Sequence, residues 1–363
     1  MKSQRPLVPV FAPYPSVEDP LVENEYDAPE FRDDVRSWFA PLPVDWEWVP
    51  VTVADVGRVV ENAARAARER PVIVLNLCDG TDHGYPGVSV LHALESAGVA
   101  ASGVDSRFYE LSTSKVAMKH RFRAAGVATS PWVEIEDIES DLRRAAQELG
   151  WPLFLKPDIS GGSVGISLRS FARNHGEAVD EAASLLAGMQ AGTFERSGIY
   201  AETFLSGREF TVLVQSTGET QDAVRVYPPA ERIFHSALPV EERFLSYERY
   251  YQEYELETPP PPGEPFYRHV SVEPELAAAI TETARRAYVA LEARGYARVD
   301  LRQMGESGVL NVLEANANCG LTSDDNSSAG CILGLAGVPL SEFVLRALRE
   351  AWLRRHGGTA SPV

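Results

Sequence analysis

The sequence reads ARVDLRQMGESGVLNVLEANANCG from Ala297 to Gly320. In its first half, apolar and charged residues alternate with period two. This alternation predicts a strand with Arg298, Asp300 and Arg302 on one face.

The second half, 309–316, alternates in the same way and places Glu314 and Asn316 on one face. The glycine-containing segment between the halves predicts a hairpin. If the two faces coincide, Asp300 joins these residues in a set of two carboxylates and one amide. Such oxygens are the ligands that Mg²⁺ prefers when it also bridges phosphates. A solvated hairpin face with an Asp–Arg pair is the alternative interpretation.

A glycine-rich turn follows the predicted strand 151–156 and leads into a predicted strand at 166–168. Its residues 160–165 read SGGSVG, and glycines there allow backbone N–H groups to approach phosphate oxygens. Lys156 precedes the turn and supplies a point charge. The spacing is neither that of a P-loop nor that of the dinucleotide fingerprint, and a plain hairpin is the alternative.

A third segment, 201–210, reads AETFLSGREF. Backbone groups at 202–205 are suited to an adenine edge, and the apolar side chains there to its faces. Glu209 is placed to bind ribose hydroxyls. A polar turn with exposed glutamates is the alternative.

Taken in order, these segments resemble the ATP-grasp superfamily, and most closely its D-alanine–D-alanine ligase branch. The matching phrases are LFLKP from Leu153, GSVGIS from Gly162, FLSGREFTV from Phe204, GYARVD from Gly295 and LEAN from Leu313. The resemblance runs from about residue 75 to about 351, roughly three quarters of the chain.

The resemblance implies a mixed α/β and α+β architecture, the ATP-grasp fold. An N-terminal open α/β domain (1–112) precedes two α+β domains (113–200 and 201–363) that clamp ATP. The implied reaction phosphorylates a carboxylate to an acylphosphate, which an amine then attacks, releasing ADP and phosphate. ATP and two Mg²⁺ ions are the implied cofactors, with Mn²⁺ as a substitute, and a homodimer fits the resemblance.

The resemblance also implies roles for individual residues. The ATP ligands would be Lys115, Lys156, Gly161, Gly162, Ser163, Glu202, Phe204, Leu205 and Glu209. The Mg²⁺ ligands would be Asp300, Glu314 and Asn316. The groups that stabilise developing charge would be Arg298, Ser163 and the backbone at Gly320.

The segment expected to bind the donor, which is the amino acid whose carboxylate is phosphorylated, departs from the family pattern. The segment 79–87 reads DGTDHGYPG, with Pro86 where the family has the glutamate that binds the first ammonium group. Asp79 and Asp82 are candidates to replace that glutamate, and His83 is a further candidate pocket residue.

Two further segments also depart from the family pattern. They are the lid over the ATP site and the loop 318–326, called the acceptor loop because the family binds the second amino acid there. In the lid, 244–251, Arg249 and Tyr251 are candidates for the family's lysine and tyrosine. In the acceptor loop, Asp325, beside Asn326, stands where the family has a serine that receives a carboxylate. A desolvated aspartate there would repel a carboxylate, which argues against a simple D-alanine acceptor. The alternative is that Asp324 and Asp325 cap a helix and face water.

The resulting hypothesis is a ligase that joins two amino-acid-like substrates, as a dipeptide ligase of specialised metabolism. The alternatives are a divergent D-alanine–D-alanine ligase of cell-wall synthesis and a catalytically silent ATP-binding regulatory protein. The net charge of −18 disfavours nucleic acid and anionic membranes as partners. Three cysteines without a CxxC pair favour a reducing, cytoplasmic setting, and the seven histidines show no zinc spacing.

Outside these motifs, periodicity predicts helices at 53–70, 88–97, 113–125, 138–149, 178–189, 276–291 and 340–353. It predicts strands at 7–11, 72–77 and 211–215. The segment 14–39 is predicted as a loop with at most one short helix, and 228–265 as a long loop.

Overall fold

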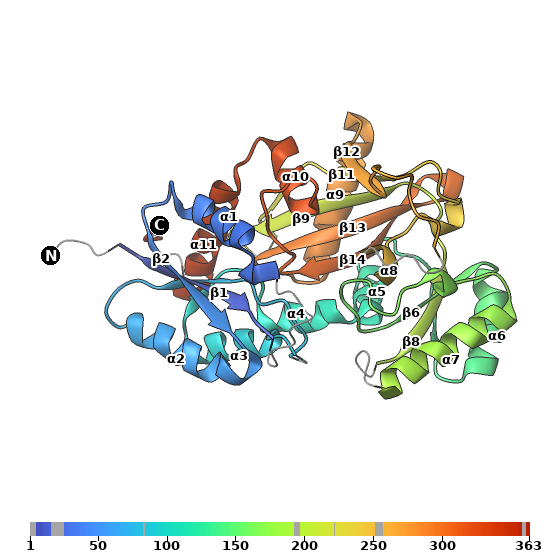
Figure 1. Ribbon diagram of the computed structural model, residues 1–363, viewed down its shortest axis with the longest axis horizontal. Helices are drawn as coiled ribbons and strands as arrows, with labels where there is room; N and C mark the ends of the chain where they lie inside the picture. Colours follow the sequence, from blue (N-terminus) through green and yellow to red (C-terminus); the bar gives the residue numbers. More distant parts are fainter. Residues whose placement is uncertain are drawn as a thin grey trace.

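The computed structural model describes residues 5–15, 25–82, 84–191, 197–220, 222–250, 257–357 and 361–363. Within them the chain forms three sheets, each with its own helices (Figure 1). The N-terminal and central sheets lie at opposite ends of the view, and the C-terminal sheet lies between and above them.

The N-terminal sheet is parallel, with strand order β2-β1-β3-β4. Its strands are β1 (Leu7–Pro13), β2 (Asp45–Val51), β3 (Ile73–Asn76) and β4 (Ala100–Ala101). Helices α2 (Val56–Ala66) and α3 (Val88–Ala97) pack on one face, and α1 (Pro29–Phe39) and α11 (Leu340–His356) on the other. The open α/β architecture expected for this region is confirmed.

The central sheet is antiparallel, in the order β5-β8-β6-β7. Its strands are β5 (Trp132–Ile135), β6 (Leu153–Pro157), β7 (Phe171–Ala172) and β8 (Ile199–Thr203). Helices α6 (Ile138–Leu149) and α7 (His175–Ala191) cover one face. The other face carries an aromatic cluster around Phe154.

The C-terminal sheet is antiparallel, in the order β12-β11-β9-β13-β14, with β10 also paired to β9. Its strands are β9 (Glu209–Ser216), β10 (Val224–Val226), β11 (Ala230–Phe234), β12 (Tyr267–Ser271), β13 (Tyr296–Met304) and β14 (Val309–Ala317). Helix α9 (Pro274–Ala290) packs on one face, and α10 (Ser328–Ala336) and α11 on the other. Helices α4 (Ser106–Thr113) and α5 (Lys115–Ala124) connect the N-terminal and central sheets.

Most predicted elements form, and two helices have the predicted bounds, α3 at 88–97 and α6 at 138–149. Helix α3 ends where Gly98 adopts a left-handed φ of 68°, which a glycine takes without steric cost. The predicted helix at 113–125 forms as α5 at 115–124, because Ser114 is extended and caps it, and Thr113 is the last residue of α4.

The one helix allowed within 14–39 forms as α1, an 11-residue helix whose start is set by Pro29 at its first turn. Two predictions about local structure are wrong. The predicted strand at 166–168 is instead a turn leading into the 3₁₀ turn Leu168–Ser170, and the strand follows at β7. The predicted loop at 228–265 contains β11, the 3₁₀ turn Val240–Glu242 and the short helix α8 (Tyr247–Tyr250).

The division into domains at 112/113 and 200/201 stays a prediction. The last central strand, β8, runs to Thr203 and so crosses the second boundary. Within the part of the chain that the structure describes, no single helix is long and apolar enough to cross a membrane. The pair α10 and α11 meets that test by length and composition, with a bend of 97° between them.

Candidate active site

A cavity of about 430 Å³ lies between the central and C-terminal sheets. It is lined by every residue expected to bind ATP, metal or developing charge: Lys115, Lys156, Gly161, Gly162, Ser163, Glu202, Phe204, Leu205, Glu209, Arg298, Asp300, Glu314, Asn316 and Gly320. Asp79, which follows β3, lines it from the N-terminal side. The structure therefore brings together motifs that are up to about 240 residues apart in the sequence.

Asp300 lies at the centre of this cavity wall. It pairs directly with Glu314 across the β13–β14 ladder, and Arg298 pairs with Asn316, so the four side chains share a face. The Arg298 guanidinium donates to both carboxylate oxygens of Asp300, at 2.8 to 3.1 Å. Thr211 Oγ1 donates to Asp300 at 2.8 Å. Burial alone would raise the pKa of Asp300, but Arg298 outweighs it and holds that pKa below its ordinary value.

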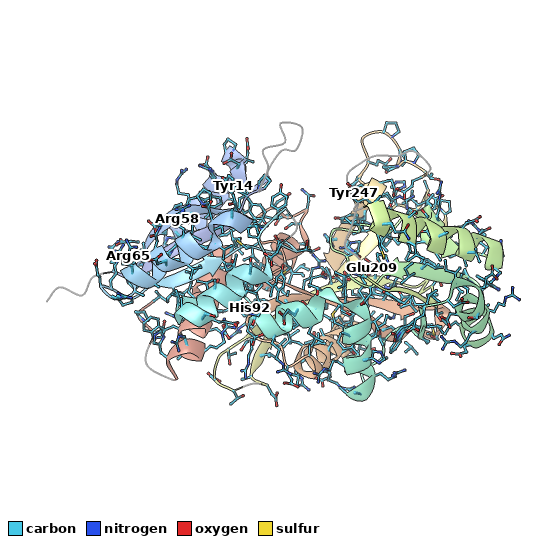
Figure 2. All side chains as sticks on the ribbon, turned by 90° about the horizontal axis from the view of Figure 1, so that it is seen from below. Tyr14, Arg58, Arg65, His92, Glu209 and Tyr247 are labelled. Atoms are coloured by element: carbon cyan, nitrogen blue, oxygen red, sulfur yellow. The ribbon has the colours of Figure 1, made fainter. Side chains whose placement is uncertain are left out.

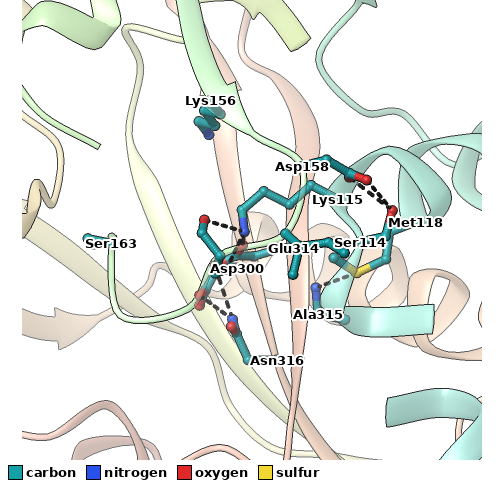
Figure 3. A network of polar contacts seen from close by, with 12 residues as sticks. Ser114, Lys115, Met118, Lys156, Asp158, Ser163, Asp300, Glu314, Ala315 and Asn316 are labelled. Atoms are coloured by element: carbon teal, nitrogen blue, oxygen red, sulfur yellow. Dashed lines mark hydrogen bonds and ion pairs between the residues drawn. The ribbon is translucent and has the colours of Figure 1, made fainter. Parts of the chain in front are cut away.

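Lys115 connects the glycine-rich turn to this carboxylate pair. Its Nζ donates to the Ser160 carbonyl oxygen at 2.7 Å and lies 3.5 Å from Glu314 Oε2. The start of α5 is fixed by Asp158, whose carboxylate accepts hydrogen bonds from the Ser114 hydroxyl and from the next helical N–H group. Figure 3 shows Lys115, Asp300, Glu314 and Asn316 pointing toward one another. A cation is thus held beside the carboxylates, where phosphate charge would be neutralised.

Glu202 forms a buried ion triad with two lysines. Its carboxylate lies 2.6 Å from Lys119 Nζ and 2.8 Å from Lys156 Nζ. Burial would raise the pKa of Glu202, but the two lysines together lower it to about 2. Because both carboxylate oxygens face lysines, an adenine at this position would meet the backbone of the segment rather than this side chain.

The glycine-rich turn contacts the lid directly. Ser163 adopts a left-handed φ of 61°, unusual for a residue with a side chain, and its hydroxyl donates to the Leu245 carbonyl at 3.1 Å. Tyr247 N donates to the Ile166 carbonyl at 2.9 Å. Phe244 packs edge-on against Phe154, with ring centroids 5.0 Å apart. The turn and the lid therefore close one end of the cavity with apolar rings suited to a purine.

Glu209 is buried between two arginines on neighbouring strands. It pairs with Arg232 on β11 and with Arg302 on β13, and it forms an ion pair with each. In Figure 2, Glu209 and Tyr247 lie in the half of the molecule away from Tyr14 and Arg65. The residue expected to bind ribose is thus in the cleft, with two guanidinium partners that the sequence analysis did not foresee.

A divalent cation fits the oxygen set at Asp300, Glu314 and Asn316. The Asn316 amide nitrogen lies 3.0 Å from Asp300 and 3.3 Å from Glu314, so the three groups converge, and rotating the amide presents its oxygen to the same point. No group of three or more His, Cys, Asp or Glu suited to a metal occurs among the described residues. The set thus suits Mg²⁺, which takes few protein carboxylates and completes its shell with phosphate and water.

The candidate residues for binding the donor amino acid do not all lie at the cavity. Asp79 lines the cavity, with its carboxylate 3.5 Å from the Tyr26 hydroxyl, and Tyr26 also lines the cavity. Asp82 instead caps α3: its carboxylate accepts hydrogen bonds from Gly87 N at 2.7 Å and from Ser89 N at 2.9 Å. His83 lies outside the described residues.

Replacing Asp82 by alanine is expected to lower the free energy of unfolding by about 1–2 kcal/mol, because a helix cap is lost. The KM for amino-acid substrates is expected to stay unchanged. Urea denaturation and steady-state kinetics measure the two effects, and Asp82→Asn is the matched control, since asparagine caps helices and tolerates the left-handed φ of 65°. A raised KM at unchanged stability would instead give Asp82 a substrate role.

Arg249 does not line the cavity. Its side chain is fully buried and forms ion pairs with Glu242 and Glu257, and its guanidinium stacks 4.5 Å from the Phe266 ring centroid. Arg249 therefore holds the lid segment in place through Glu242 and Glu257, which lie on either side of it in the sequence. Tyr251 lies outside the described residues.

The acceptor loop turns Asp325 away from the cleft. Asp325 lines a separate cavity of about 300 Å³, together with Ser37 and Leu340. The cap of α10 is Ser327, which accepts a hydrogen bond from Gly330 N, so neither aspartate is the N-cap. Asn326 is exposed and donates to Asp324.

The loop is also held from the N-terminal unit. Asp34 on α1 accepts a hydrogen bond from Ser323 N at 2.8 Å and another from the Trp38 indole at 3.0 Å. Helix α1 therefore helps to set the position of the acceptor loop.

Cys319 lies beside Arg298 at the cavity wall. Burial raises the pKa of its thiol to about 12. The thiol is protonated at neutral pH, which agrees with a packing role and not with a nucleophilic one.

Among the polar residues at or beside the cavity, sequence reasoning gave no binding role to Tyr26, Lys119, Arg232 and Arg302. Tyr26 and Arg232 stand in segments predicted as loops. Lys119 follows Lys115 by one helical turn, a signal that could have placed it on the same face of α5.

Comparisons with known proteins show which family this chain resembles. Residues 122–346 match the family model described as D-ala D-ala ligase C-terminus. The D-alanine–D-alanine ligase of Synechococcus sp. is 30% identical over 284 residues, 77% of this chain and 77% of that protein. That of Acinetobacter baumannii is 29% identical over 255 residues, 70% of this chain and 71% of that protein.

Solved structures show the same fold. The Bacillus anthracis D-alanine–D-alanine ligase complexed with ATP has a TM-score of 0.64 at 19% identity, covering 98% of this chain and 99% of that chain. The VanG D-Ala:D-Ser ligase from Enterococcus faecalis has a TM-score of 0.66 at 17% identity, covering 96% and 100%.

The fold and the cleft define an ATP-grasp enzyme, a ligase that forms carbon–nitrogen bonds and uses ATP. Within that class, the chain belongs to the D-alanine–D-alanine ligase family.

Proposed function

We propose that the protein joins two amino acids through an acylphosphate, with release of ADP and phosphate. The observation that carries this proposal is the convergence, in one cavity, of the cations Lys115, Lys156 and Arg298 with the carboxylates Asp300 and Glu314. Phosphoryl transfer depends mainly on positioning and on neutralising spread negative charge, and this set supplies both.

Nucleotide binding is divided among three parts of the wall. The glycine-rich turn offers backbone N–H groups to the phosphates, and Lys115 and Lys156 add charge. Phe154 and Phe204 contact the purine, and Glu209 accepts hydrogen bonds from the ribose. Asp300, Glu314 and Asn316 hold Mg²⁺, which when bound neutralises phosphate oxygens.

The amino-acid end lies between Asp79 and Arg298. A zwitterionic donor would place its ammonium on Asp79 and its carboxylate toward Arg298. Arg298 stabilises the negative charge that develops when the carboxylate is phosphorylated and when the amine attacks. Gly320 N–H is a further donor on the wall, and the Ser163 hydroxyl also lies there, with its proton donated to the Leu245 carbonyl.

Two candidate reactions differ in which amino acids are joined. A dipeptide ligase of specialised metabolism rests on the altered donor segment at 79–87. A divergent D-alanine–D-alanine ligase is supported at least equally, because the relatives carry that name. The exposed position of Asp325 also removes the repulsion that argued against a D-alanine acceptor.

The test is ADP and phosphate release with ATP and Mg²⁺ across a matrix of paired L- and D-amino acids, with mass spectrometry of the products. An active pair with stoichiometric ADP and a condensed product would support the ligase and identify both substrates. Turnover with D-alanine alone would favour the cell-wall alternative. ATP binding without phosphate release across the matrix would favour the silent regulatory protein and contradict the proposal.

A further inference from the structure

A row of polar side chains crosses the C-terminal sheet on its cleft face. Arg302, Glu209, Arg232 and His269 occupy directly paired positions on β13, β9, β11 and β12. Directly paired residues point to the same face of a sheet. His269 therefore lies on the face that carries Asp300, two strands beyond Glu209.

This row carries more positive than negative charge. One carboxylate, Glu209, faces two guanidinium groups. Arg302 is held independently by the carbonyl oxygens of Gly207, at 3.2 Å, and Arg243, at 2.6 Å. Arg232 is 7% exposed and lines the cavity. The buried guanidinium of Arg232 is therefore only partly neutralised, because it shares the single carboxylate of Glu209 with Arg302.

Three polar atoms in the same place lack hydrogen-bond partners. Arg232 Nε and both ring nitrogens of His269 are buried without a hydrogen bond in the described structure. The backbone of Asn326 lies close to the imidazole but forms no hydrogen bond of regular geometry with it. Buried polar atoms are hydrogen-bonded in nearly all proteins, so a cluster of exceptions indicates a missing partner.

The missing partner has a definable chemistry. Burial, followed by the charge of Arg232, lowers the pKa of His269 to about 4, so its imidazole is neutral at pH 7 and offers one N–H donor. A guanidinium with a spare donor beside a neutral N–H donor favours an oxyanion over a cation or an apolar group. Arg232 lines the cavity and is not one of the nucleotide contacts assigned above, and His269 lies beside it on the neighbouring strand.

We propose that Arg232, supported by His269, forms an oxyanion-binding subsite at the β11–β12 edge of the cleft. The proposal rests on the proposed function, because that reaction supplies the oxyanion. Two groups share the chemistry, the γ-phosphate of ATP and a carboxylate of an amino-acid substrate.

The test uses the full chain with Arg232→Gln, the conservative Arg232→Lys, and Arg268→Gln as the matched control. Arg268 precedes His269 on β12, is exposed and points to the opposite face of the sheet. Calorimetry measures the affinities for MgATP and MgADP, and for inorganic phosphate added to the MgADP complex. Steady-state kinetics with an active amino-acid pair measures each KM.

If the γ-phosphate occupies the subsite, Arg232→Gln weakens binding of ATP and of phosphate by about 10- to 100-fold and leaves ADP unchanged. If a substrate carboxylate occupies it, the KM of one amino acid rises by about the same factor and the ATP affinity stays unchanged. In both cases Arg232→Lys recovers part of the loss, and Arg268→Gln matches the wild type.

Two results would overturn the proposal. Equal loss of ATP and ADP affinity, with loss of discrimination against 2′-deoxy-ATP, would show that Arg232 only positions Glu209. No change in any of these quantities would show that the subsite binds nothing. Should Arg232→Gln fail to fold, His269→Phe, which keeps the ring volume and removes both nitrogens, is measured in its place.

Failure of the proposed function is distinguishable from failure of the subsite. If the wild type ligates no amino-acid pair, the proposed function fails. The nucleotide and phosphate titrations then decide the subsite alone, and unchanged values in Arg232→Gln reject it.

Discussion

Replacement of Asp300 by asparagine is expected to lower the rate of ADP formation by about 10³-fold, because metal-assisted stabilisation of phosphoryl transfer contributes several kcal/mol. Asp300 is the most buried of the three proposed metal ligands and pairs with Arg298, so the variant also weakens the positioning of that guanidinium. Glu314→Gln is expected to show a loss of similar size with less effect on folding, since the Glu314 side chain is 28% exposed.

The measurement is ADP release as a function of Mg²⁺ concentration, with Mn²⁺ binding followed by electron paramagnetic resonance as a readout independent of turnover. Glu275→Gln, on the exposed first turn of α9, is the matched control. Normal turnover of both variants at ordinary Mg²⁺ concentrations would show that the metal assignment is wrong.

Replacement of Glu202 by glutamine is expected to lower the free energy of unfolding by about 3–5 kcal/mol, because it leaves the buried Lys119 and the partly buried Lys156 without their shared carboxylate. Lys119 is almost fully buried, with 1% of its side chain exposed, and cannot reach solvent instead. The affinity for ATP is expected to fall as well, since Lys156 loses the partner that holds it at the cavity wall.

The same triad predicts an acid dependence. The folded pKa of Glu202 is about 2, below its ordinary value of 4.5. Its contribution to stability is therefore complete above about pH 4.5 and is lost as the pH falls toward 2. Urea denaturation followed by circular dichroism across this range should give a steeper loss for the wild type than for Glu202→Gln.

Glu148→Gln is the control for the triad, since Glu148 is exposed near the end of α6, a helix that packs on the same central sheet. Parallel stability curves for the wild type and Glu202→Gln would contradict the account of a paired, ionised glutamate.

The parts of the site that could be predicted are those set by local periodicity. Strand alternation places Glu314 and Asn316 on one face of their strand and Arg298 and Asp300 on one face of theirs. That the two faces coincide depends on the register of the hairpin, in which Asp300 pairs with Glu314. The register shift between Asp300 and Leu301 was not predictable, yet it preserves the direct pairing of Asp300 with Glu314.

The parts that could not be predicted depend on pairings between distant segments. Arg232 stands in a proline-rich stretch, and only its register against Glu209 on β9 and His269 on β12 brings it into the cleft. Arg249 has the charge expected of a lid residue, but the burial of its partners Glu242 and Glu257 is a property of the folded loop. The bounds of helix α1 were not predicted, because acidic and proline residues obscured its apolar face, which packs through Val35, Trp38 and Phe39.

The hydrogen bond from Ser323 N to Asp34 has a consequence for engineering. It couples helix α1 to the loop 318–327, two segments that lie almost 300 residues apart in the sequence. A chimera that replaces residues 25–39 by a segment without an acceptor at position 34, while keeping the loop 318–327, would lose this anchor. Segment exchange is therefore expected to disturb the fold less when both segments come from the same protein.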